Sequence, residues 1–118
     1  MDKCVLIFDD DTEILYLCSA ILKNTYKVVT RSRCDNVPED VEAIKPDIIL
    51  MDLWIPSIGG AKATELLKQI PTTANIPILL FSANADIKEI AVSVNADGYL
   101  EKPFDIKKLK ETIEQYVL

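Results

Sequence analysis

The sequence contains no histidine, and it has no long run of apolar residues. Without histidine or a cluster of thiolates, zinc and copper lack the ligand sets that they prefer. No stretch approaches the roughly 18 apolar residues that cross a bilayer. The opening MDKCVLIFDDD is no secretory signal, because its short apolar run ends in three carboxylates rather than in small residues. We therefore expect a cytoplasmic protein that makes no contact with a membrane.

Cysteine is scarce, and basic residues are outnumbered. The three cysteines, Cys4, Cys18 and Cys34, are an odd count without CxxC spacing, so neither a disulfide framework nor a zinc site is predicted. The net charge of −6 argues against nucleic acid, whose phosphates would be repelled. The length of 118 residues suits one core, and we expect one domain over residues 1–118.

Short runs rich in β-branched residues alternate with longer amphipathic stretches. The runs predict strands at 4–8, 27–29, 47–50, 76–81 and 98–100. The amphipathic stretches predict helices at 12–24, 35–45, 60–70, 86–95 and 106–117. Asp11, Asp86 and Asp105 stand where helix N-caps are expected. Strict alternation of strands and helices indicates an α/β fold, with a parallel sheet between two layers of helices.

Polar residues follow four of the predicted strands, where an open α/β sheet binds its ligands. They are Asp9, Asp10 and Asp11 after the first strand, Asp52 after the third, Ser82 after the fourth and Lys102 after the fifth. Because the carboxyl ends of parallel strands share one edge, we expect these side chains to meet there. Asp11 is the exception, since it is expected to cap the following helix.

The charges of this predicted cluster favour a hard divalent cation. Asp9, Asp10 and Asp52 outnumber Lys102, and crowded carboxylates raise one another's pKa. Oxygen ligands suit Mg²⁺, with Mn²⁺ as an alternative. Such an ion would neutralise an incoming phosphoryl group, which Lys102 and Ser82 would also contact. Asp52 could then act as the nucleophile and form an acyl phosphate.

The strings VLIFDDD, ILMDLWIP, LLFSA and GYLEKPF resemble the four signature segments of the response-regulator receiver domain of two-component signalling, in the family's order and spacing. The resemblance covers essentially the whole chain. It implies a flavodoxin-like sheet of order 2-1-3-4-5 and a cis Lys102–Pro103 bond. It implies the following site: Asp9, Asp10, Asp52 and the backbone carbonyl of Trp54 hold the metal, Asp52 is the phosphoacceptor, Lys102 pairs with the phosphoryl group, and Ser82 and Tyr99 are the switch residues.

The resemblance also implies partners. The chain has no histidine, so its phosphoryl donor is expected to be a histidine kinase, a histidine phosphotransfer protein or a small acyl phosphate. We expect a signalling domain rather than an enzyme, one that assists its own phosphorylation and dephosphorylation and controls an output domain or protein. The sequence leaves open the identity of that output, dimerisation on phosphorylation, and whether the receiver stands alone or belongs to a larger regulator or hybrid kinase.

The loop after Asp52 departs from the family pattern. Gly59 replaces the usual acidic residue or asparagine and is followed by Gly60, so the loop is expected to be looser or to approach the site more closely. Trp54 is unusually large for its place. We hypothesise that it shields the acyl phosphate and slows its hydrolysis.

Three alternatives are weighed against this interpretation. FDDDTE partly matches the motif of haloacid dehalogenase phosphatases, but Glu13 fills the position of their threonine or valine. A flavodoxin-like electron carrier needs a phosphate-binding loop after the first strand, where aspartates would repel the phosphate. A degenerate receiver would bind partners without phosphorylation, and the full acidic set with Ser82 and Lys102 argues against it.

Overall fold

The computed structural model describes residues 2–117, in which strands and helices alternate along the chain. The strands are β1 (Cys4–Phe8), β2 (Lys27–Arg31), β3 (Ile48–Asp52), β4 (Ile78–Ser82) and β5 (Gly98–Glu101). The helices are α1 (Thr12–Leu22), α2 (Val37–Ile44), α3 (Gly60–Gln69), α4 (Ile87–Ser93) and α5 (Ile106–Tyr116). Met1 and Leu118, the ends of the expected domain range, lie outside the described residues.

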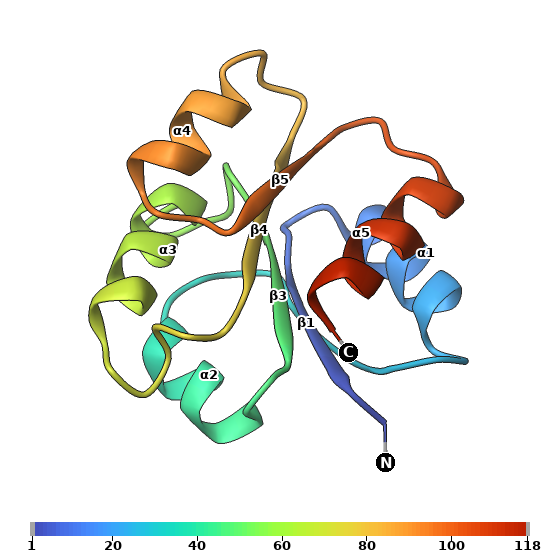
Figure 1. Ribbon diagram of the computed structural model, residues 1–118, viewed down its shortest axis with the longest axis horizontal. Helices are drawn as coiled ribbons and strands as arrows, with labels where there is room; N and C mark the ends of the chain where they lie inside the picture. Colours follow the sequence, from blue (N-terminus) through green and yellow to red (C-terminus); the bar gives the residue numbers. More distant parts are fainter. Residues whose placement is uncertain (1, 118) are drawn as a thin grey trace.

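The strands form one parallel sheet of order β2-β1-β3-β4-β5, which confirms the predicted fold. Every residue of β1, β3 and β4 is buried, which explains why these runs are apolar almost throughout. The helices cover both faces of the sheet, with α1 and α5 on one side and α2, α3 and α4 on the other (Figure 1).

Successive residues of a strand point to opposite faces of the sheet, so alternate residues contribute to two separate hydrophobic cores, one on each face. In β1, Leu6 and Phe8 face the core that α2, α3 and α4 complete. Val5 and Ile7 face the core that α1 and α5 complete. The three cysteines are free and buried in the two cores or at the start of β1. Within residues 2–117, no helix is long and apolar enough to cross a membrane.

The helix starts show where the predicted caps hold and where one fails. The Asp11 side chain accepts hydrogen bonds from the backbone N–H groups of Glu13 and Ile14, and Asp105 accepts one from Lys108. Asp86 occupies the N-cap of α4, but its side chain caps nothing. Its backbone is not in the extended region that lets a cap reach forward, with φ −92° and ψ 14°.

Most element boundaries differ by one or two residues from the sequence-based ranges, and two of these differences concern strands that end at the site. β4 begins at Ile78 rather than at residue 76, because the Ile76 N–H still bonds to Thr73 in the turn that follows α3, and Pro77 has no N–H to pair. β3 includes Asp52 as its last residue, so the strand itself fixes the backbone of this aspartate. The Lys102–Pro103 peptide bond is cis, as expected.

Candidate functional site

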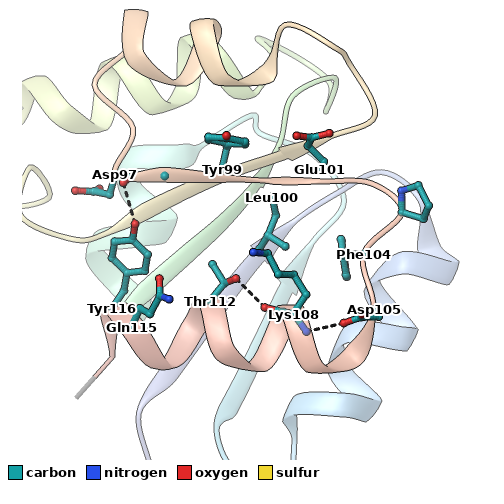
Figure 2. A pocket seen from close by; sticks show the side chains of 12 residues that line it. Asp97, Tyr99, Leu100, Glu101, Phe104, Asp105, Lys108, Thr112, Gln115 and Tyr116 are labelled. Atoms are coloured by element: carbon teal, nitrogen blue, oxygen red, sulfur yellow. Dashed lines mark hydrogen bonds between the residues drawn. The ribbon is translucent and has the colours of Figure 1, made fainter.

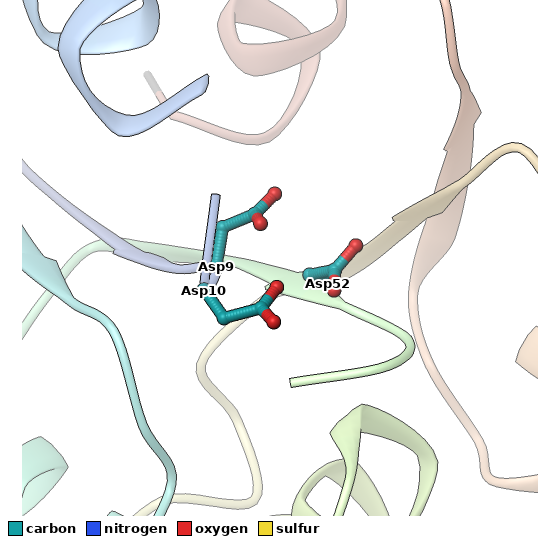
Figure 3. Close-up of side chains that lie close together, drawn as sticks. All are labelled: Asp9, Asp10 and Asp52. Carbon is teal, nitrogen blue, oxygen red and sulfur yellow. The ribbon is translucent and has the colours of Figure 1, made fainter. Parts of the chain in front are cut away.

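Three carboxylates meet at the carboxyl edge of the central strands. Asp9, Asp10 and Asp52 each offer an oxygen atom within 4.8 Å of the others, and Figure 3 shows their side chains turned to a common space. The sheet register causes this meeting, because Phe8 of β1 is paired with Met51 of β3 and the aspartates come next on both strands. Asp9 and Asp52 are 1% and 5% exposed, whereas Asp10 is open to solvent.

Lys102, which directly follows the edge strand β5, contacts two of these carboxylates. Its Nζ atom lies 2.9 Å from Asp9 Oδ2 and 2.9 Å from Asp52 Oδ1. The ammonium also lies 4.7 Å from the centre of the Phe81 ring, within the range of a cation–π contact. The Lys102 backbone N–H donates to the Ser82 carbonyl at 2.9 Å, so the lysine continues the pairing of β5 with β4.

Burial and pairing act against each other at this cluster. Burial raises the pKa of Asp9 above its usual value, although hydrogen bonds from the Asp11 backbone and from Lys102 partly oppose the rise. Burial by itself lowers the pKa of Lys102, but the hydrogen bonds with Asp52 and Asp9 outweigh it, and the net pKa is raised. The lysine is therefore held in its charged form, and it supplies the cluster with its single neutralising charge.

The remaining carboxylate oxygens are bound by backbone, except those of Asp10. Asp9 Oδ1 accepts from the Asp11 N–H at 2.9 Å, and Asp52 Oδ2 accepts from the Trp54 N–H at 3.2 Å. Within the described part of the chain, the Asp10 carboxylate makes no hydrogen bond or ion pair. Asp10 thus has both oxygens available to a cation, while Asp9 and Asp52 are already oriented.

Ser82 lies at the end of β4, next to β3, but it is not bonded to the carboxylates. Its buried Oγ accepts a hydrogen bond from the Asn84 N–H at 3.1 Å. Asn84, which the sequence analysis missed, also accepts from the Asp86 N–H through its side chain at 2.7 Å. An asparagine two residues beyond a strand-end serine is the signal that could have indicated this turn.

Tyr99 lies outside the carboxylate cluster, in the middle of the edge strand β5. Its ring stands on the opposite face of β5 from Leu100, which faces α5 (Figure 2). A hollow of about 690 Å³ lies between β5 and α5, and Tyr99 and Tyr116 are among its lining residues. Tyr116 closes one end of the hollow by donating from its hydroxyl to the Asp97 carbonyl at 3.0 Å.

The loop after Asp52 combines an exposed tryptophan with a glycine that lies against the backbone of Asp52. The Trp54 side chain is 69% exposed. Gly59 has φ +87°, which side chains rarely adopt. A Cβ atom on Gly60 would lie 2.1 Å from the Asp52 carbonyl oxygen, closer than any real contact. The paired glycines were expected either to loosen the loop or to let its backbone approach the site. The structure shows the close approach.

The assembled groups can hold a hard cation and present a carboxylate nucleophile. Three aspartate oxygens within 4.8 Å are a donor set for a divalent ion that prefers oxygen. Asp52 belongs to this donor set and also contacts the Lys102 ammonium. Its carboxylate would therefore lie beside both a bound cation and the ammonium, an arrangement that suits displacement at a phosphoryl group.

The chain resembles receiver domains in both sequence and structure. The family model described as "Response regulator receiver domain" matches residues 5–114. The nisin biosynthesis regulatory protein NisR of Lactococcus lactis subsp. lactis is 33% identical over 114 residues, which are 93% of this chain and 48% of NisR. The signal transduction histidine-protein kinase BarA of Escherichia coli K12 is 31% identical over 117 residues, which are 95% of this chain and 12% of BarA.

A solved structure shows the same fold. The receiver domain of sensor histidine kinase PA1611 from Pseudomonas aeruginosa PAO1, crystallised with a magnesium ion in its active-site cleft, matches with a TM-score of 0.89 and 23% identity over 98% of both chains. This chain spans only about half the length of the first curated relatives that it matches. The matches distinguish it from haloacid dehalogenase phosphatases and flavodoxins. The chain belongs to the response regulator receiver domain family of two-component signalling.

Proposed function

We propose that residues 1–118 act as one phosphoacceptor domain, which takes a phosphoryl group onto Asp52 and controls an output partner by a change of conformation. The observation that carries the proposal is the position of Asp52. Its carboxylate lies within 4.8 Å of two other aspartates and 2.9 Å from the Lys102 ammonium. A structural carboxylate needs one partner, whereas this arrangement supplies the charge balance of phosphoryl transfer.

Mg²⁺ is the metal that fits the donor set, and Mn²⁺ is an acceptable substitute. Asp9, Asp10 and Asp52 offer hard carboxylate oxygens, and Asp10 is open to the solvent from which a hydrated ion would come. The backbone carbonyl of Trp54 completes the proposed ligands. When bound, the ion neutralises negative charge on the carboxylate and phosphoryl oxygens. The magnesium-bound receiver of PA1611 supports this choice.

In the proposed transfer, one Asp52 oxygen attacks the phosphorus of a phosphohistidine on a donor protein. An O–P bond forms, and the P–N bond breaks with its electron pair left on the imidazole nitrogen. Lys102 exchanges its contact with the Asp52 carboxylate for one with a phosphoryl oxygen. In the proposed dephosphorylation, water attacks the phosphorus, the bond to the Asp52 oxygen breaks, and inorganic phosphate leaves.

Ser82 and Tyr99 are the proposed switch residues. The Ser82 hydroxyl accepts from Asn84 and still has its own proton to donate, so it can bind a phosphoryl oxygen at the end of the neighbouring strand. Tyr99, partly exposed on β5, would change its rotamer as the end of β4 moves. New phosphoryl contacts thereby bias an existing equilibrium between two conformations.

The proposed donor is a histidine kinase or a histidine phosphotransfer protein, and the output is a further domain or a separate protein. NisR and BarA support the first of these outputs, a further domain, since the matching segment is part of a longer protein in each. A cytoplasmic location, dimerisation on phosphorylation and the absence of direct contact with nucleic acid belong to the same proposal. The net charge of −6 supports the last of these.

The test is phosphorylation by acetyl phosphate with Mg²⁺, followed by intact mass. The wild type should gain one phosphoryl group, and Asp52→Asn should gain none. Asp86→Asn is the matched control, because Asp86 is exposed and its side chain caps nothing, and it should be labelled like the wild type. Labelling of Asp52→Asn at the native site would contradict the assignment. Failure of the wild type to bind beryllofluoride at saturation would favour the degenerate receiver.

A further inference from the structure

Hydrogen bonds hold the loop that follows Asp52 at both of its ends, whereas the Trp54 carbonyl within it accepts none from the described residues. The Leu53 N–H donates to the Phe81 carbonyl at 3.3 Å, and the Leu53 carbonyl accepts from the Gly60 N–H at 2.9 Å. Among residues 2–117, none donates a hydrogen bond to the Trp54 carbonyl. This is the group proposed above as a metal ligand, so its position depends on what holds its neighbours.

The two residues after Trp54 are both held by Cys34, which comes from the connection between β2 and α2. The Cys34 thiol donates to the Ile55 carbonyl at 3.5 Å. The Cys34 backbone N–H donates to the Pro56 carbonyl, and Cys34 forms a bridge of parallel type with Ser57. The side chain is 1% exposed and belongs to the same core cluster as Ile55.

We infer that Cys34 is a positioning residue for the metal site, because it fixes the peptide units directly after the Trp54 carbonyl. The inference rests on the proposed function, since it assumes that this carbonyl binds Mg²⁺. Among the described residues, the hydrogen bonds of Cys34 go to Ile55 and Pro56 and not to the proposed metal ligands. By holding the loop in one conformation, Cys34 lowers the conformational entropy that the loop loses when the ion binds, and so raises the affinity for Mg²⁺.

The geometry predicts a reciprocal effect. If the metal binds only when the loop is seated against Cys34, the metal must stabilise the seated loop by the same factor. A buried thiol reacts with an alkylating reagent only when local opening exposes it. Mg²⁺ at ten times its Kd should therefore slow alkylation of Cys34 about ten-fold. Cys4, at the start of β1 and away from the loop, should react at an unchanged rate.

The experiment uses the wild-type chain and three variants. Trp54 is the sole tryptophan, so its fluorescence reports Mg²⁺ binding, with calorimetry as an independent check. Cys34→Ala removes the thiol contact and should weaken Mg²⁺ binding about three- to ten-fold. Cys34→Ser keeps a donor and should restore most of the affinity. Cys4→Ala is the matched control, because Cys4 is also buried but lies at the start of β1, away from the loop.

The outcomes separate this inference from the proposed function. A wild-type chain that binds no Mg²⁺ refutes the metal site itself. If the wild type binds Mg²⁺, and Cys34→Ala binds it as tightly as Cys4→Ala does, the site stands and the role of Cys34 is refuted. Should Cys34→Ala fail to fold, mass spectrometry of wild-type peptides after alkylation decides. Selective protection of Cys34 supports the inference, and equal protection of Cys4 or no protection overturns it.

Discussion

Lys102 and Asp52 lie 50 positions apart in the chain, yet their charged atoms are 2.9 Å apart, and the same ammonium lies 2.9 Å from Asp9. The lysine thus pairs with two buried carboxylates and balances half of their charge before any ion or phosphoryl group arrives. Phosphorylation would convert one of these carboxylates into an acyl phosphate. The new phosphoryl oxygens would then compete with the Asp9 carboxylate for the lysine ammonium. This competition gives the conformational switch a physical origin.

Lys102→Ala should separate phosphorylation from its consequence. Asp52 and the metal ligands stay in place, so acetyl phosphate should still label the variant. The phosphoryl group loses its lysine contact, so the shift of Tyr99 should be absent or much reduced. Intact mass measures the labelling, and NMR of the Tyr99 ring measures the shift. Replacing Lys107, whose ion pair with Glu111 is exposed, should change neither. A full shift in labelled Lys102→Ala would contradict the proposed coupling.

Trp54→Asn should shorten the life of the acyl phosphate several-fold. The Trp54 backbone N–H donates to Asp52 Oδ2, and the large side chain is mostly exposed, so it can limit the approach of water without being part of the core. The decay of the phosphorylated form, followed by mass after removal of acetyl phosphate, measures the effect. Tyr16→Asn removes an exposed aromatic ring from α1 and serves as the comparison. An unchanged decay rate in Trp54→Asn rules the shielding hypothesis out.

Gly60→Ala should reduce both stability and phosphorylation. The new Cβ would overlap backbone atoms of Asp52, which cannot rotate away, and overpacking of this kind costs about 1–3 kcal/mol. Gly98→Ala is a useful contrast, because its Cβ would meet side-chain atoms of Tyr116 and Leu79 instead. That variant should lose stability but keep its phosphorylation rate. Urea unfolding and labelling by acetyl phosphate measure the two properties, and normal labelling of Gly60→Ala would refute the role of this contact.

Lys68→Met should destabilise the end of the sheet opposite the site. The Lys68 ammonium is 11% exposed and pairs with Asp97 at 2.6 Å. It also donates to the Ala74 and Ile76 carbonyls. Without the ammonium these acceptors lose a hydrogen-bond donor, which should lower the free energy of unfolding by about 1–3 kcal/mol.

Lys62→Met tests the same change on the solvent side of α3, where the Lys62–Glu65 pair is open to water. It should cost no more than about 0.5 kcal/mol. The free energy of unfolding in urea is the measurement for both variants, and equal losses would contradict the importance of the buried pair. Neither variant should alter Mg²⁺ affinity, since Lys68 contacts no residue of the metal site.

Stability should fall in the alkaline range, and Cys18 should contribute to the fall. Burial raises the pKa of Cys18 from 9.0 to about 11, and the nearby charge of Asp9 acts in the same direction. The unfolded chain loses this proton at lower pH than the folded chain. The stabilisation is therefore complete below the unfolded pKa and is lost as the pH rises through the folded one. Unfolding free energies measured across this range should decline less steeply in Cys18→Ala. An identical slope in the wild type and the variant would contradict the shift.

The sequence by itself determined the layered fold and most of the candidate site. Asp9, Asp52, Ser82 and Lys102 each follow or end an apolar strand, and parallel strands bring their carboxyl ends to one edge whatever the packing details. The helix caps Asp11 and Asp105 are equally local, since each depends on a few residues of backbone. Asp86 failed as a cap because its backbone dihedrals are set by the turn that Asn84 organises.

Only the tertiary structure decided which groups share partners. Lys102 contacts Asp9 and Asp52 together because the packed sheet sets the distances between the ends of β1, β3 and β5. The spacing of these residues along the chain does not reveal which carboxylates the lysine contacts. The contacts of Cys34 with Ile55 and Pro56 join two loops that the sequence treats as unrelated. Periodicity and strand order are properties of single segments, whereas hydrogen bonds between loops depend on how the segments pack. That is the physical reason why the aspartates could be predicted and the residue that positions their loop could not.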